Sequence, residues 1–233
     1  MDKLAKSGTL KNCLAYNVKA SADQAPCITD AETKWSDFKD NSVPLDVDMM
    51  EAILSYAVSD DDSASSNWNF VWGLYVSSSS AAEKKSISRA LAQTTDEEVI
   101  KDYITRCMDP DLVRTSNGLY IIGRVISKAN KVATQISIDL LVDQWLTIYN
   151  TFKTLDLEMS TYVTTIVSQV STEADLERIT ATFEDRDTGE LLSTIPEAAY
   201  RAGVETAKSN IAWIAKNQAA IEKFVDEGEN DTD

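Results

Sequence analysis

The sequence predicts an all-α protein whose antiparallel helices stack in layers, as in an α-solenoid. Apolar residues recur at helical spacing through most of the chain. Seven glycines and four prolines are few for 233 residues, and no long alternating apolar pattern with hairpin-turn signals is present. Helix starts expected near residues 80, 95 and 110 lie about fifteen residues apart, which is typical of short helices joined by tight turns.

Capping signals mark the helix starts in the middle of the chain. Ser80 and Glu83 form a capping box ahead of an apolar stripe, because hydroxyl and carboxylate can each satisfy a backbone N–H at a helix start. Thr95 and Glu98 repeat this pattern, so one helix is expected to end near residue 93 and the next to begin at once. The Asp-Pro pair at 109–110 is expected to close that second helix.

Further helices are expected on both sides of this junction. The stretch 160–170 is β-branched, but its helical flanks and the lack of a partner strand favour a helix. Tryptophans and tyrosines at helical spacing are interpreted as core residues and not as a ligand-stacking box. We expect one helical domain over residues 1–233 with a disordered tail at 227–233. The expected helices are 1–20, 27–40, 46–58, 67–76, 115–128, 133–153, 160–170, 172–183 and 196–226.

The charge of the chain argues against several classes of partner. Thirty-eight acidic and 22 basic side chains give a formal charge of −16, which repels nucleic acid and anionic membrane surfaces. No stretch of about 18 apolar residues and no signal-peptide core are present, so we expect a soluble chain without direct membrane insertion. A solvated acidic surface is the favoured interpretation of the charge, and a cation-attracting cavity is the alternative.

Histidine is absent, which excludes an imidazole base and every HExxH zinc motif within this chain. The acidic runs at 60–62 and 184–190 lack the ligand pattern of an EF-hand loop, so solvated loops are expected there. We therefore expect no metal, no cofactor and no catalytic residue in this chain. Cys13 and Cys27 form a candidate disulfide if the chain matures in an oxidising compartment, whereas Cys107 lies on an apolar stripe and is expected to be a buried thiol.

Several motifs, in this order, resemble the C-terminal helical domain of the aminopeptidase N type of zinc metallopeptidases, the gluzincins. The resemblance extends from about Pro44 to Val225. The matching motifs are Trp68 with Phe70, Glu83 with Lys84, the Ala-Leu-Ala at 90–92, Pro110 with Arg114, Gln144-Trp145, the segment 171–185, and Glu205, Asn210, Ile211 and Trp213.

This resemblance implies an α-solenoid of HEAT-like helix pairs that forms the wall of a substrate cavity and limits peptide access to the active site. The zinc, held by an HExxH helix and a distant glutamate, belongs to the parent enzyme's catalytic domain upstream. The implied partners are that catalytic domain and peptide substrates. The chain itself would be a noncatalytic later part of the last domain. Many members are extracellular and membrane-anchored, and others are cytoplasmic.

Arg114 is the best candidate for contact with a peptide, because a cation on the cavity wall can meet a carboxylate. An ion pair with Asp109 or Asp111, or a helix-cap role, is the favoured alternative, and Asn117 is a weaker candidate. The chain departs from the family at 116–117, 127–134 and 138–140, and at Ser55 and Gln93, where some members carry a disulfide. These departures also fit a second hypothesis, a stand-alone α-solenoid module that binds proteins or peptides without peptidase activity.

Overall fold

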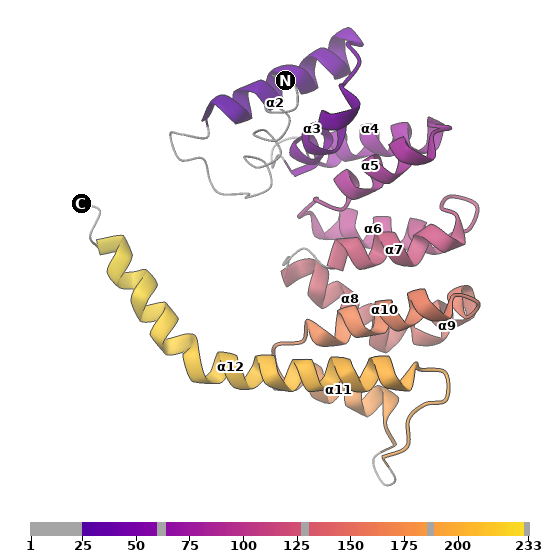
Figure 1. Ribbon diagram of the computed structural model, residues 1–233, viewed down its shortest axis with the longest axis vertical. Helices are drawn as coiled ribbons and strands as arrows, with labels where there is room; N and C mark the ends of the chain where they lie inside the picture. The colour runs from indigo at the N-terminus through magenta and orange to yellow at the C-terminus, as the bar shows by residue number, and fades with distance from the viewer. Residues whose placement is uncertain (1–24, 60–63, 127–130, 186–188, 231–233) are drawn as a thin grey trace. The chain divides into compact units, whose positions relative to one another are not determined.

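A computed structural model describes residues 25–59, 64–126, 131–185 and 189–230 (Figure 1). Eleven α-helices make up almost all of the regular structure in these ranges, and the pairing of Glu184 with Leu191 is an isolated β-bridge. The predicted all-α, solenoid-like class is therefore confirmed, while the helix predicted over 1–20 lies outside the described residues. The helices are α2 (Ala25–Asn41), α3 (Val47–Ser59), α4 (Ala64–Ser77), α5 (Ala81–Leu91), α6 (Glu97–Met108), α7 (Thr115–Ile126), α8 (Lys131–Asp143), α9 (Trp145–Phe152), α10 (Asp156–Ser168), α11 (Glu173–Phe183) and α12 (Glu197–Asn230).

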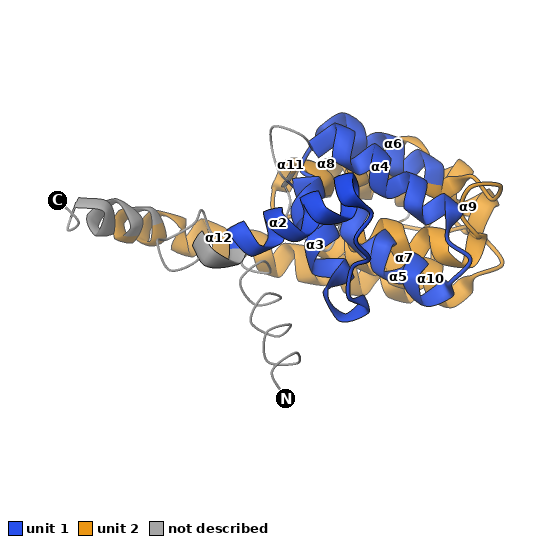
Figure 2. Cartoon of the chain, turned by 90° about the horizontal axis from the view of Figure 1, so that it is seen from above, with its two compact units in different colours: residues 1–106 blue, residues 107–233 orange. Residues whose placement is uncertain are grey.

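The chain divides into two compact units, residues 1–106 and residues 107–233, drawn in blue and orange in Figure 2. The division falls inside α6, near its end. The prediction of one domain over residues 1–233 stays a prediction, as does the disordered tail, of which the structure describes the helical backbone through residue 230.

The core of the first unit is built around the aromatic face of α4. Trp68 and Trp72, one helical turn apart, stack with ring centroids 5.8 Å apart, and Tyr103 from α6 meets both rings edge-on. The Arg106 guanidinium lies over the same two indoles, at 5.2 and 4.9 Å from their centroids. Trp68 Nε1 donates a hydrogen bond to the Leu91 carbonyl at 3.1 Å, which ties α4 to the end of α5. These contacts confirm that Trp68 and Trp72 are core residues, whereas Trp213, which is 57% exposed, is not.

The predicted cap of α5 is confirmed in one half and modified in the other. Ser80 Oγ accepts a hydrogen bond from the Glu83 N–H at 3.3 Å, as a capping box requires. The Glu83 carboxylate instead accepts a hydrogen bond from Ser78 Oγ at 2.7 Å, and Ser78 Oγ accepts one from the Ser80 N–H at 3.1 Å. Ser78 thus relays the reciprocal half of the cap.

The predicted cap at Thr95 is wrong. The helix starts at Glu97, and Asp96 Oδ1 accepts hydrogen bonds from the N–H groups of Glu98 (2.9 Å) and Val99 (3.0 Å). A carboxylate at the N-cap also interacts favourably with the positive end of the helix dipole, so Asp96 displaces its neighbour as the cap.

The second unit is organised around α10, which packs against α7, α8 and α12. The stretch predicted as one helix over 133–153 is two helices, because the chain breaks between Asp143 and Trp145. Trp145 is buried at the first turn of α9, where its Nε1 donates a hydrogen bond to Thr194 Oγ1 at 2.8 Å and its ring meets Phe183 edge-on. This tertiary anchoring sets the orientation of α9 independently of α8.

Candidate peptide-contacting surface

The surface predicted to meet a peptide begins in the turn between α6 and α7. This turn spans 109–114, and the next helix begins at Thr115, which confirms the helix predicted over 115–128, while the helix start expected near residue 110 is wrong. Asp109 Oδ1 accepts a hydrogen bond from the Asp111 N–H at 2.8 Å, and the Asp109 carbonyl accepts from Leu112 and Val113. The Asp109 side chain is thus engaged in shaping the turn.

Gly118 fixes the start of α7 against its neighbours. A Cβ atom at this position would lie 2.3 Å from the Cys107 carbonyl oxygen and 3.1 Å from the Phe152 ring. Only glycine permits this close approach of α7 to the end of α6 and to α9. The residues just before Gly118 are therefore held on a packed helix start and not on a free loop.

Arg114 and Asn117 are both exposed at this helix start. Among the described residues, no ion pair is found at the Arg114 guanidinium, and the role of this side chain stays a prediction. The Arg114 carbonyl accepts hydrogen bonds from the N–H groups of Asn117 (2.7 Å) and Gly118 (3.2 Å). The cap role of Arg114 is consequently a backbone role, and its side chain presents a cation to solvent.

Sequence reasoning missed two apolar neighbours of this pair. Tyr120 is 42% exposed and follows Asn117 by three residues, which places both on one side of α7. Leu112 is 45% exposed in the preceding turn. The sequence did contain a signal for Tyr120, since it follows Asn117 by three residues and helical spacing places the two side chains on the same surface. A cation, an amide and an aromatic ring therefore share this surface.

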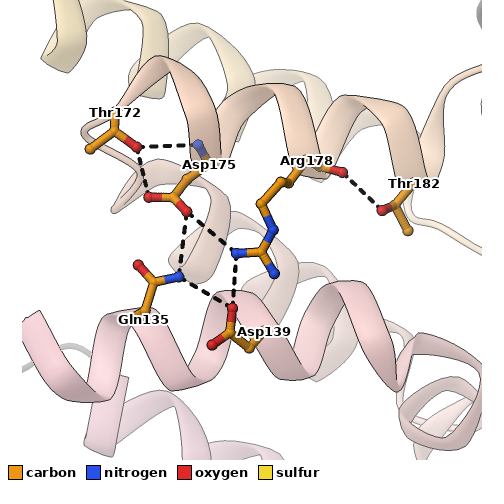
Figure 3. A network of polar contacts seen from close by, with 6 residues as sticks. All are labelled: Gln135, Asp139, Thr172, Asp175, Arg178 and Thr182. Carbon is orange, nitrogen blue, oxygen red and sulfur yellow. Dashed lines mark hydrogen bonds and ion pairs between the residues drawn. The ribbon is translucent and has the colours of Figure 1, made fainter.

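A second polar cluster joins α8 to α11 and is drawn in Figure 3. Arg178 Nη1 lies 2.9 Å from Asp139 Oδ1 and 3.5 Å from Asp175 Oδ1, and Gln135 Nε2 donates to the same two carboxylates. The hydrogen bond to Asp139 raises the pKa of the Arg178 guanidinium above its usual value. Thr172 Oγ1 caps α11 by accepting a hydrogen bond from the Asp175 N–H at 3.2 Å. The cluster is largely exposed and its polar groups satisfy one another, so it braces two helices.

The structure describes some of the positions considered for metal binding and thiol chemistry, and others lie outside the described residues. Over the ranges that the structure describes, no group of three or more metal-ligating side chains is found. The acidic run at 60–62 and the candidate Cys13–Cys27 disulfide lie outside the described residues, since the Cys27 side chain is not described. Cys107 is 1% exposed, which confirms the predicted buried thiol, and burial raises the pKa of this thiol.

Short helices packed against one another, which make up almost all of the regular structure described, are typical of helical-repeat domains. Comparison with protein families identifies which one. The model of the ERAP1-like C-terminal domain matches residues 5–201, and the chain belongs to this family. The predicted resemblance is thereby confirmed, although the match begins before Pro44 and ends within α12.

Individual relatives are aminopeptidases. Aminopeptidase N of Canis lupus familiaris is 23% identical over 155 residues, which cover 66% of this chain and 15% of the relative. Endoplasmic reticulum aminopeptidase 1 of Homo sapiens is 26% identical over 200 residues, 82% of this chain and 20% of the relative. Endoplasmic reticulum aminopeptidase 2 of Bos taurus is 22% identical over 225 residues, which cover 96% of this chain and 22% of the relative. The chain therefore spans about a fifth of the length of such relatives. Within the described ranges, no helix combines the length and apolar character needed to cross a bilayer.

Proposed function

We propose that this chain acts as the noncatalytic C-terminal domain of a zinc aminopeptidase, where it walls the substrate cavity and limits peptide access to the active site. Membership of the ERAP1-like C-terminal domain family is the observation that carries this proposal. Stacked helix pairs supply a curved wall, because small rotations between successive pairs accumulate along the stack.

The chemistry would lie outside this chain. The sequence contains no histidine, so it cannot supply the HExxH motif that the resemblance implies for the zinc of the parent enzyme. The catalytic domain of the parent aminopeptidase would hold the zinc and would be the partner of this domain. Two of the relatives are named for the endoplasmic reticulum, which supports a parent facing a non-cytoplasmic compartment, with a cytoplasmic parent as the alternative.

The surface at the start of α7 would meet the peptide beyond its first residues. Arg114 offers a cation without a carboxylate partner among the described residues, and Asn117 offers an amide donor beside it. A guanidinium binds a carboxylate through parallel hydrogen bonds, so the C-terminal carboxylate or an acidic side chain of a peptide is the expected ligand.

A peptide-binding measurement tests this assignment. A fluorescein-labelled ten-residue peptide is titrated with the purified chain, once with a free C-terminal carboxylate and once amidated, and fluorescence anisotropy is recorded. The free carboxylate should bind about 3- to 10-fold more tightly, and Arg114→Ala should remove that difference. Lys153→Ala, which removes another exposed cation, is the matched control and should preserve it. Equal binding of both peptides by the unmodified chain would reject the role of Arg114.

The second candidate function is a stand-alone module that binds proteins or peptides without peptidase activity. Departures from the family pattern at Ser116 and Asn117 favour it, because they fall at the proposed contact surface, and the departure at 138–140 is compatible with it. In that case the chain would bind folded protein partners as well as peptides, whereas a cavity wall would bind short peptides alone. Competition between a labelled peptide and a folded partner protein separates the two functions.

A further inference from the structure

The long helix α12 carries an apolar stripe from Tyr200 to Phe224, and the first part of this stripe is buried. Tyr200, Val204 and Ala207 are buried, and a Cβ atom on Gly203 would lie 2.8 Å from Val167 Cβ of α10. Asn210 ends this packed part by donating a hydrogen bond from Nδ2 to the Ser168 carbonyl at 2.8 Å.

The same stripe continues beyond α10, where its side chains are half-buried at Ile214 and Asn217 and exposed at Ile221 and Phe224. Steps of four and three residues lead from Asn210 to Ile214, Asn217, Ile221 and Phe224, which is the spacing of a coiled-coil seam. Phe224 is 78% exposed and Ile221 is 45% exposed, while Trp213, at the edge of the stripe, is 57% exposed. Figure 1 shows this end of α12, in yellow, extending past α10 and α11. We call residues 211–230 the α12 arm.

The charges along the arm select the kind of partner. Its sequence after residue 221 contains four acidic residues and Lys223, which disfavours an anionic membrane surface. The residues leading into it, 207–217, contain Lys208 and Lys216 and no acid. An antiparallel pair of such helices would place each cationic segment beside the anionic segment of the other copy, and it would also oppose the two helix dipoles. A parallel pair would place the acidic segments together.

We propose that the α12 arm is a self-association surface, on which a second copy of this chain docks in antiparallel orientation. With residue 219 at the centre, Ile214 of one copy lies beside Phe224 of the other, and Asn217 beside Ile221. This pairing extends the seam already formed between α12 and α10. It stands apart from the proposed cavity-wall function, and the whole arm lies after residue 201, where the family match ends.

The size of the arm sets the strength of the dimer. Twenty helical residues are about 30 Å long, and a strip of that length and one helix width buries on the order of 400 Å² per copy. A standard stable interface buries about 800 Å² per partner, so the dimer should be weak, with a dissociation constant on the order of 10–100 µM.

Sedimentation equilibrium of the full chain tests the proposal at about 5 µM to 1 mM in 0.15 M salt. The weight-average mass should rise with concentration from the monomer value of 25.7 kDa towards twice that mass. Phe224→Glu should weaken association at least about 10-fold, because each dimer loses two seam residues. Ala219→Glu adds the same charge on the opposite side of the helix and is the matched control, expected within about twofold of the unmodified chain. A monomer at every concentration, or equal effects of the two variants, would overturn the proposal.

Disulfide trapping tests the orientation. A mixture of Ile214→Cys and Phe224→Cys chains, oxidised and mapped by peptide mass spectrometry, should yield the 214–224 crosslink between copies. Phe224→Cys alone should not crosslink to itself, because the two copies of this position would be about 15 Å apart, beyond disulfide reach. A dominant 224–224 crosslink would refute the antiparallel arrangement.

Discussion

Replacing Gly118 by alanine should destabilise the second unit even though alanine is the better helix former. The added Cβ would lie 2.3 Å from the Cys107 carbonyl oxygen, which is backbone and cannot rotate away, and 3.1 Å from the Phe152 ring. Overpacking of this kind costs about 1–3 kcal/mol, and the gain in helix propensity offsets up to about 1 kcal/mol. The net loss is thus roughly 1–2 kcal/mol, or a fall in Tm of about 2–8 °C for a chain of this size.

Gly123→Ala in the same helix is the matched control. A Cβ atom there meets nothing within 4 Å, so this substitution should leave stability unchanged or raise it by up to about 1 kcal/mol. Both variants are unfolded thermally and followed by circular dichroism at 222 nm. Equal stabilisation by the two substitutions would refute the close approach of α7 to the end of α6, and with it the rigid placement of Arg114.

Three further perturbations test other parts of the structure. Burial raises the pKa of Tyr162 and of Tyr200 above the unfolded value near 10, so the folded state retains protons that the unfolded state releases. The urea midpoint of unfolding should therefore fall as the pH rises above about 10, and Tyr162→Phe should lessen that fall. Asp139→Asn should cost at most roughly 0.5 kcal/mol at low salt, because the pair with Arg178 is exposed, and the cost should vanish near 0.5 M salt. Asn67→Ala should cost about 1–3 kcal/mol in urea unfolding, since the buried amide donates to the Ala57 carbonyl at 2.9 Å.

The features that were predicted correctly depend on neighbouring residues. The aromatic face of α4 follows from the spacing of Trp68 and Trp72, and the cap of α5 follows from Ser80. Each is a local signal, because side-chain direction on a helix is set by its own periodicity. Local signals also explain the wrong cap at the start of α6. Thr95 and Asp96 are both suitable N-cap residues, and the sequence favours Thr95 because it forms a capping-box pattern with Glu98.

The features that were predicted wrongly depend on distant residues. The break before α9 is stabilised by the hydrogen bond from Trp145 to Thr194, 49 residues away, which no local periodicity reveals. The absence of a helix start near residue 110 reflects the turn around Asp109. The surroundings of Arg114 also depend on the folded turn, in which the Asp109 carboxylate accepts a hydrogen bond from the Asp111 N–H.

Hydrolysis of a fluorogenic amino-acid amide by the purified chain, with metal content read on the same sample, tests the central claim most directly. The account predicts no turnover and no bound zinc, because the chemistry would belong to a catalytic domain that this histidine-free chain does not supply. Metal-dependent turnover that follows the protein through purification would contradict the account, since a domain proposed to wall a cavity would then carry an active site of its own.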